Sequence, residues 1–285
     1  MTSLTTPSGL LGDTAGRDYS RKLKLFNAFA APELRQAMGS LALKPGMRVL
    51  DAGCGTGEAL GWLAAEVAPG GVVIGMDLAA SHIRAACAMA SEDAALVLQA
   101  NLLEAPMAPA SFDLAWSVNV INHLRSPSAG IDALGSLLRP GGRIALGQSS
   151  LLPDMYFAWD ARLERLVNEA VRQYYRDRYQ LDERDLTAIR AIVGLLRNAG
   201  LQDVHVRTFM IERTAPLRHE DEDYLVEAIF RDTWGSRLQP YLTSGDYEEL
   251  IRLCDPLHPG FALRRPDFHF LQSFTLVVGT TVHIP

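Results

Sequence analysis

Short apolar runs alternate with helical patterns over the first half of the chain. We expect these runs to form strands at Val49–Leu50, Val72–Met76, Leu96–Ala100, Phe112–Ser117 and Arg143–Gly147. Apolar strands that alternate with helices are typical of a parallel sheet with helices on both faces. Ligands of such sheets bind beyond the carboxyl ends of the strands, where this chain places polar residues. The pattern therefore predicts an α/β fold with a binding site along that edge.

Helical spacing of apolar residues marks the segments around these strands. It extends from Arg17 to Leu43, and Pro32 within this stretch predicts a break, so we expect two helices before the first strand. Further helices are predicted to begin at Glu58 and to cover Ala80–Ala90 and Ser128–Leu138.

The pattern changes after residue 150. Aromatic and charged residues dominate 151–181 and predict an inserted helix, and 216–265 predicts a second helical insertion. The other elements expected here are a helix over Leu186–Asn198, a sixth strand over Val204–Ile211, helices near 221–232 and 246–254, and a final β segment over Phe268–Val282. Because the insertions follow the fifth and sixth strands, we expect them to lie over the strand ends.

These patterns divide the chain into a core and a lid. The length of 285 residues, 48% of them hydrophobic, suits one large domain or one domain plus a cap. We assign the lid to residues 1–46, 151–181 and 216–265, and the core to residues 47–150, 182–215 and 266–285.

Composition argues against several classes of protein. The net charge is −6 and the 27 Lys and Arg residues are scattered, whereas a nucleic-acid partner needs a basic stripe. We find no apolar run that could span a bilayer and no secretory signal, so we expect no membrane partner and a cytoplasmic location. The three cysteines lie far apart and the seven histidines show no paired spacing, so we expect no metal site.

The stretch from Met47 to Gly57 carries the strongest chemical signal. Gly53, Gly55 and Gly57 follow the first strand at alternate positions, a spacing that differs from the G-x-G-x-x-G dinucleotide fingerprint and lacks the Lys-Ser/Thr of a phosphate loop. A second acid, Asp77, ends the next strand, where a carboxylate can bind both hydroxyls of a ribose. Together the loop and Asp77 predict a nucleoside site.

At this point the chain resembles class I S-adenosylmethionine (SAM)-dependent methyltransferases. Val49–Gly57 is similar to the first motif of that family, and Asp77 matches the acid at the end of its second strand. Phe112–Ala115 and Leu138–Arg143 are similar to its fourth-strand motif and to the turn before its fifth strand. The resemblance implies a Rossmann-like, doubly wound, seven-stranded and mostly parallel sheet with the last strand antiparallel, and SAM as cofactor.

The resemblance also implies roles for residues of the loop. Asp51 would help to hold the amino group of the methionine portion, and backbone at Ala52, Gly53 and Gly55 would face that portion and the ribose. Asp77 would bind the ribose hydroxyls.

Other implied contacts surround the adenine and the methionine arm. Leu78 would pack on one face of the adenine, and Asn101 and Leu102 would lie at its edge. Asn101 stands where the family often has Asp, and its amide oxygen can still accept a hydrogen bond from the adenine. Ser117 and Val118 would line the methionine arm.

Two residues outside these motifs are candidates for a lid residue over the cofactor and for a catalytic base. Tyr19 is placed like the aromatic lid residue of many relatives, with packing on the helix face as the alternative. Methyl transfer needs an aligned acceptor and a dry site, and some acceptors need a base. His123 follows the fourth strand and is the candidate base, with capping or packing as its alternative; His82 begins the helix after Asp77, where we expect it to cap.

Two functional hypotheses remain. The first is a methyltransferase that acts by direct in-line displacement on a small organic acceptor, such as a specialised metabolite, because the aromatic insertions suit a planar substrate. The alternative is a SAM-binding protein that does not methylate: an enzyme for a cofactor-assisted cyclisation or rearrangement, or a scaffold. The sequence does not indicate which atom of the acceptor receives the methyl group. It also leaves open whether the protein is a homo-oligomer, since such an N-terminal helix can cap its own site or a neighbour's.

Overall fold

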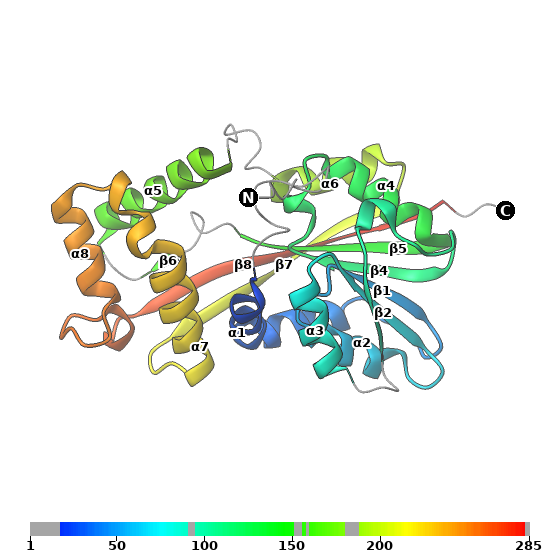
Figure 1. Cartoon of the computed structure of the whole chain (residues 1–285), viewed down its shortest axis with the longest axis horizontal. Helices are drawn as coiled ribbons and strands as arrows, with labels where there is room; N and C mark the ends of the chain where they lie inside the picture. Colours follow the sequence, from blue (N-terminus) through cyan, green and yellow to red (C-terminus); the bar gives the residue numbers. More distant parts are fainter. Residues whose placement is uncertain (1–17, 91–94, 151–155, 158–159, 180–187, 283–285) are drawn as a thin grey trace, which may run out of the picture.

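The computed structural model describes residues 18–90, 95–150, 156–157, 160–179 and 188–282 (Figure 1). Its centre is one eight-stranded sheet with the order β3-β2-β1-β4-β5-β8-β6, in which β7 pairs with the other edge of β8. The strands are β1 (Arg48–Ala52), β2 (Val72–Asp77), β3 (Leu96–Gln99), β4 (Phe112–Val118), β5 (Leu138–Ser149), β6 (Tyr156–Phe157), β7 (Gln202–Thr214) and β8 (His269–Thr280).

The sheet is parallel from β3 to β5, and β8 runs antiparallel to each of its neighbours. The expected Rossmann-like sheet with an antiparallel last strand is therefore confirmed. The additional short strand β6 lies in a region where the sequence predicted only helix. It pairs with β8 beyond the end of β5 and so prolongs the same edge.

Helices cover both faces of the sheet (Figure 1). Side chains of α1, α2 and α3 pack in one buried cluster with one face of the strands, and those of α4 and α6 pack in another with the opposite face. The helices are α1 (Ser20–Gly39), α2 (Glu58–Val67), α3 (Ala80–Met89), α4 (Pro127–Leu137), α5 (Ala161–Tyr179), α6 (Ala188–Asn198), α7 (His219–Asp223), the π-helix η5 (Tyr224–Trp234) and α8 (Ser244–Cys254). Short 3-10 helices are η1 (Leu102–Glu104), η2 (Ile121–His123), η6 (Gly235–Arg237), η7 (Gln239–Tyr241) and η8 (Ala262–Arg264).

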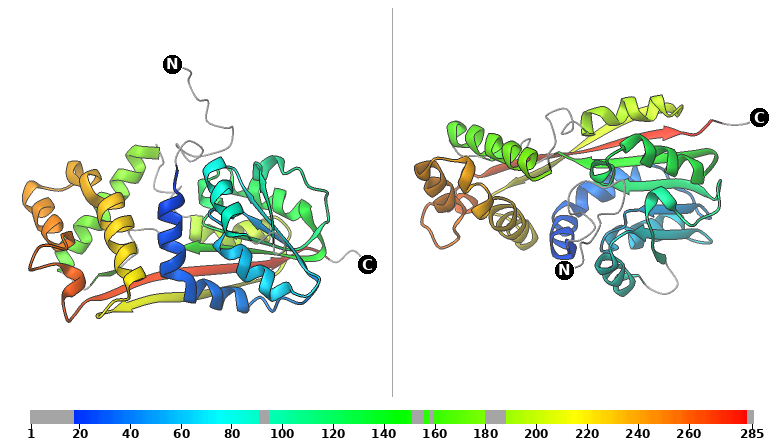
Figure 2. Two further views of the ribbon diagram at one scale, coloured as in Figure 1. Left: turned by 60° about the horizontal axis from the view of Figure 1, so that its bottom comes forward. Right: turned by 45° about the horizontal axis from the view of Figure 1, so that its top comes forward.

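The prediction of two N-terminal helices is wrong, because α1 continues through Pro32 and bends near it (Figure 2). A proline inside a helix removes a hydrogen bond and costs roughly 3 kcal/mol. Phe29 and Leu34 are buried on either side of the bend. Burial of each such side chain contributes about 1.5–3 kcal/mol, so packing offsets the cost of the proline.

Strands β7 and β8 form a long ribbon that leaves the core and carries the cap (Figure 1). Ser149, the last residue of β5, pairs with Phe274, so the stretch of β8 before Phe274 lies beyond the carboxyl end of β5. Helices α5, α7, η5 and α8 gather around this part of the ribbon. The inserted segments therefore lie on the side of the sheet where the parallel strands end. None of the helices in the described part of the chain combines the length and hydropathy that a bilayer span requires.

Candidate functional site

The loop between β1 and α2 is shaped by glycines that no larger residue could replace. Gly53 has φ +80°, and a Cβ on it would lie 2.2 Å from the Val120 side chain. Gly57 has φ +92°, and its Cβ would lie 2.9 Å from the Ala86 backbone. Positive φ and close neighbours together require glycine here. The loop is held to β2 by the amide of Gly53, which donates to the Met76 carbonyl at 2.7 Å.

Asp77 ends β2 beside this loop and is fixed by three donors. The Gly55 amide donates to Oδ2 at 3.0 Å, the Ala79 amide donates to Oδ1 at 2.9 Å, and His82 Nδ1 lies 3.1 Å from Oδ1. A carboxylate offers about four acceptor sites, so capacity remains for a ligand hydroxyl. The structure thus joins the glycine loop and the second acid, as the sequence pattern predicts.

Asp51 is a buried acid with an unsatisfied oxygen. The residue is 3% exposed, and its Oδ2 has no hydrogen-bond partner among the described residues. Burial, together with the smaller effects of the nearby charges of Asp77 and Glu58, raises the pKa of Asp51 to about 8. An orphaned buried carboxyl is costly unless a partner arrives. The site therefore fits a ligand that brings a positive charge or a donor to Asp51.

Backbone groups predicted to face the ligand are partly engaged within the protein. The Ala52 carbonyl accepts a bond from the Ser117 hydroxyl at 2.8 Å. The amides of Gly53 and Gly55 donate to Met76 and Asp77, as described above. These backbone groups therefore set the shape of the loop. The buried Ser117 side chain links β4 to β1. Val118 is half-buried at the carboxyl end of β4.

The predicted adenine contacts lie beyond the ends of β2 and β3. Leu78 is half-buried and Leu102 is buried, and both belong to the apolar cluster under α4. Asn101 caps η1, because its Oδ1 accepts from the Leu103 amide at 3.1 Å. The amide of Asn101 keeps a second lone pair and its NH2 group for other partners.

Helix α1 lies over the glycine loop. Leu23 Cδ1 is 3.2 Å from the position that a Cβ of Gly55 would take, and Asn27 donates to Glu58 Oε2 at 2.7 Å. Tyr19, immediately before α1, is half-buried. Burial is the main cause that raises the pKa of Tyr175 in α5 to about 12, and Tyr19 adds a small electrostatic effect.

His123 lies at the end of η2, after β4. Its residue is exposed at the surface, yet the crowding of protein around the ring lowers the pKa of His123 by desolvation, against a smaller opposing effect of the Asp77 charge. The lowered pKa favours the neutral imidazole, which is the form that can accept a proton. Its neighbour Asn122 has a buried Oδ1 without a partner among the described residues.

Sequence reasoning missed a polar group between the ribbon and the cap. Gln272 is 2% exposed on a face of β8 whose other residues, including Phe270 and Phe274, are apolar. Its Nε2 donates to the Ser150 carbonyl at 3.4 Å, and its Oε1 has no partner within the described residues. The signal was present in the sequence as one polar residue within the alternating apolar pattern of this strand. On the surface end of β8, His269 contacts Glu212 at 2.8 Å.

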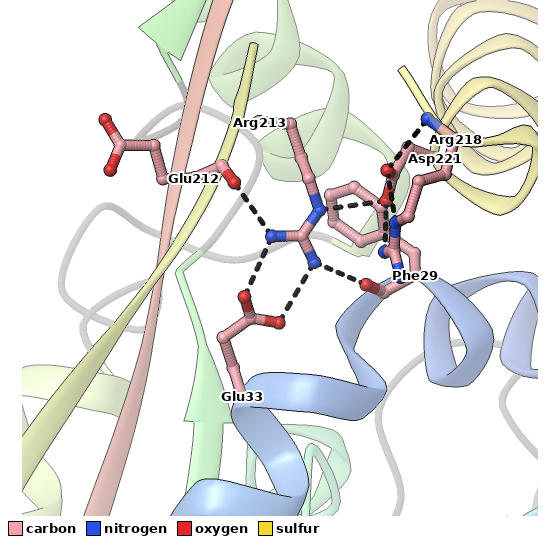
Figure 3. Close-up of polar contacts among 6 residues, drawn as sticks. All are labelled: Phe29, Glu33, Glu212, Arg213, Arg218 and Asp221. Atoms are coloured by element: carbon pink, nitrogen blue, oxygen red, sulfur yellow. Dashed lines mark hydrogen bonds and ion pairs between the residues drawn. The ribbon is translucent and has the colours of Figure 1, made fainter. Parts of the chain in front are cut away.

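Arg213, near the end of β7, joins α1 to the cap (Figure 3). It donates to both carboxylate oxygens of Glu33 at 2.8 and 3.0 Å, to Asp221 at 2.8 Å and to the Phe29 carbonyl at 2.6 Å. Its guanidinium also lies 4.8 Å from the centre of the Phe29 ring. The side chain is 10% exposed. This buried network fixes α1, β7 and α7 relative to one another, and thereby the helix that lies over the glycine loop.

Within the part of the chain that the structure describes, no group of His, Cys, Asp and Glu residues is arranged to hold a metal ion. The three thiols are free, and burial raises the pKa of Cys54, the one in the glycine loop, far above its ordinary value. Cys54 is therefore a protonated packing residue.

The family model and the two relatives described here are all methyltransferases. Residues 50–146 match a family model described as a methyltransferase domain. Nocamycin O-methyltransferase of Saccharothrix syringae is 30% identical over 227 residues, which are 75% of this chain and 77% of that protein. The 27-O-demethylrifamycin SV methyltransferase of Amycolatopsis mediterranei is 34% identical over 119 residues, 40% of this chain and 43% of that protein.

Among solved structures, the [4+2]-cyclase SpnF has the same fold. It superposes with a TM-score of 0.55, covers 98% of each chain and is 14% identical. The match to the rifamycin enzyme spans less than half of that relative, whereas the match to nocamycin O-methyltransferase spans most of both chains.

Proposed function

This chain belongs to the class I SAM-dependent methyltransferase family, and we propose that it methylates a hydroxyl group of a small organic acceptor, a specialised metabolite. The observation that carries this proposal is the identity of 30% with nocamycin O-methyltransferase over three quarters of both proteins. The rifamycin relative supports the same class of acceptor. An aromatic cluster of the cap, in which Tyr174 packs edge to face against Tyr175 and Tyr241, suits a mid-sized planar molecule.

The cofactor would lie along the carboxyl ends of β1, β2 and β4. SAM supplies a methyl group attached to a positively charged sulfur, which makes the methyl carbon electrophilic. Asp77 would bind the ribose hydroxyls, and Asp51 would receive the amino group of the methionine portion. That assignment explains why Asp51 keeps a buried oxygen without a partner among the described residues. Leu78, Asn101 and Leu102 would surround the adenine.

His123 would act on the acceptor. Its lowered pKa favours the neutral imidazole, which could take the proton of the attacking hydroxyl. The acceptor oxygen would then take the methyl group that SAM supplies, with S-adenosylhomocysteine as the leaving group, and His123 would keep the proton until solvent removes it. Helix α1 and the cap would align the acceptor and exclude water, which is most of what this reaction requires of a protein.

The test is a methyl-transfer assay. The purified full chain is incubated with SAM labelled in the methyl group and with a panel of hydroxylated polyketides and phenols, and products are analysed by mass spectrometry. Transfer of the label to an acceptor oxygen supports the proposal. Tight binding of S-adenosylhomocysteine without labelled product from any acceptor would instead favour the alternative, a cofactor-assisted cyclisation or rearrangement.

A further inference from the structure

His82, in the first turn of α3, is placed to act on the cofactor site through Asp77. Its Nδ1 lies 3.1 Å from Asp77 Oδ1, and the side chains of His82 and Asp77 are 10% and 13% exposed. The sequence suggested that His82 caps α3, and this is wrong: Ala79 is the N-cap and no side chain caps it. The amide of Ala79 donates to Asp77 instead, which leaves His82 a contact with the same carboxylate.

The contact selects one form of the imidazole. A carboxylate oxygen at hydrogen-bond distance requires a donor, so Nδ1 must carry hydrogen. The Nε2 atom is buried and has no hydrogen-bond partner among the described residues, so the ring makes its polar contact with Asp77. Histidines that orient a functional group through one ring nitrogen are a recurrent arrangement in binding sites.

The three donors to Asp77 are distributed unequally over its two carboxylate oxygens. Gly55 serves Oδ2, whereas Ala79 and His82 share Oδ1. The two amides come from backbone that the glycine loop and α3 already fix. His82 supplies the third donor, and it is the one whose removal leaves the backbone unchanged. Without it Oδ1 would keep only the Ala79 amide, so the orientation of the carboxylate would be less firmly held.

We propose that His82 is a positioning residue for the cofactor: its Nδ1–H holds the Asp77 carboxylate in the orientation that receives a ribose hydroxyl. This inference rests on the proposed role of Asp77. His82 itself does not touch the cofactor. Substitution of His82 should therefore change only the part of the binding free energy that the ribose hydroxyls contribute.

Two substitutions separate this role from simple packing. In His82→Asn the amide NH2 can stand near the position of Nδ1 and keep the bond to Asp77, whereas in His82→Gln the corresponding group reaches the position of Nε2 and cannot. Both variants remove the ring, so a packing role predicts equal effects. Affinities are measured by calorimetry for S-adenosylhomocysteine and for its 2′-deoxy analogue, with thermal unfolding as a check on folding.

We expect His82→Gln to bind S-adenosylhomocysteine about fivefold or more weakly than the wild type, as loss of one hydrogen bond to a charged group predicts. His82→Asn should stay within about twofold on the same grounds. The 2′-deoxy analogue, which lacks one hydroxyl, should lose less affinity in His82→Gln than the parent ligand does. Equal losses in the Asn and Gln variants, or equal losses for both ligands, would overturn the inference.

The variant Asp77→Asn distinguishes this failure from failure of the proposed site. If Asp77→Asn binds S-adenosylhomocysteine like the wild type, then Asp77 does not hold the ribose and both assignments fall. If Asp77→Asn weakens binding but His82→Gln does not, then only the role of His82 is rejected.

Discussion

Asp51 and Asp77 lie at the carboxyl ends of neighbouring parallel strands, and burial together with the charge on Asp77 raises the pKa of Asp51 to about 8. Two acids brought together at the edge of a sheet oppose one another unless a ligand provides positive charge. The proposed cofactor carries both an ammonium and a sulfonium group. The protonation of Asp51 should therefore change when the cofactor binds, and this change can be measured.

The first prediction concerns protons released on binding. Without ligand, much of Asp51 is protonated at pH 7, because its pKa lies above that pH. A bound ammonium favours the carboxylate, so binding of S-adenosylhomocysteine should release a proton, and affinity should rise with pH up to about 8 and then level. Calorimetry in buffers of different ionisation enthalpy measures the release. In Asp51→Asn the release should disappear, and its persistence there would assign the proton to another group.

The second prediction concerns the network of Arg213. Removal of one partner from a buried ion pair leaves an uncompensated charge and costs about 3–5 kcal/mol. Arg213→Gln should therefore lower the free energy of unfolding by roughly that amount, measured by urea denaturation. Arg265→Gln is the matched control, because Arg265 contacts Asp267 at the surface and such pairs contribute about 0–1 kcal/mol. Similar losses in the two variants would show that the Arg213 network does not stabilise the fold.

The third prediction concerns Gly53. In Gly53→Ala the new methyl group would lie 2.2 Å from Val120 and the residue would keep φ near +80°, so the loop must change shape. We expect binding of S-adenosylhomocysteine to fall by about tenfold or more, in line with the ~1–3 kcal/mol cost of a strained backbone position. Gly194→Ala is the control, since a Cβ there has no neighbour within 4 Å. Normal affinity in Gly53→Ala would mean that the loop does not shape the site.

Local signals explain why the sequence predicted the core of the site. The glycine spacing from Gly53 to Gly57 and the acid Asp77 lie in consecutive elements, and parallel strands bring their carboxyl ends to one edge. At each of these positions the residue type itself indicates the backbone conformation or the hydrogen-bond acceptor that the site needs. The strands from β1 to β5 and their order along the chain could be predicted for the same reason.

Contacts between distant segments could not be predicted. Arg213 and Glu33 are separated by 180 positions, and nothing local to either residue indicates the other. The bend of α1 at Pro32 was interpreted as a break because the local cost of proline is visible in sequence, whereas the packing of Phe29 and Leu34 that offsets it is not. The two-residue strand β6 exists only because β8 extends past β5 and offers a free edge.

His82 is an intermediate case. It follows Asp77 by only five positions, yet the sequence favoured a capping role, because capping is a local pattern and orientation of a carboxylate is not. The polar Gln272 was visible as an exception within an apolar strand pattern. Its burial became clear only from the structure.

The central claim is that the loop of Met47–Gly57 and Asp77 bind the nucleoside of SAM. Calorimetry of the full chain with S-adenosylhomocysteine and with NAD, repeated on Asp77→Ala, tests it most directly. We predict binding of S-adenosylhomocysteine and no binding of NAD, with affinity for the former reduced by about tenfold or more in Asp77→Ala, since a charge-assisted hydrogen bond contributes ~1.5–3 kcal/mol. Binding of NAD alone, or unchanged affinity for S-adenosylhomocysteine in Asp77→Ala, would contradict the account.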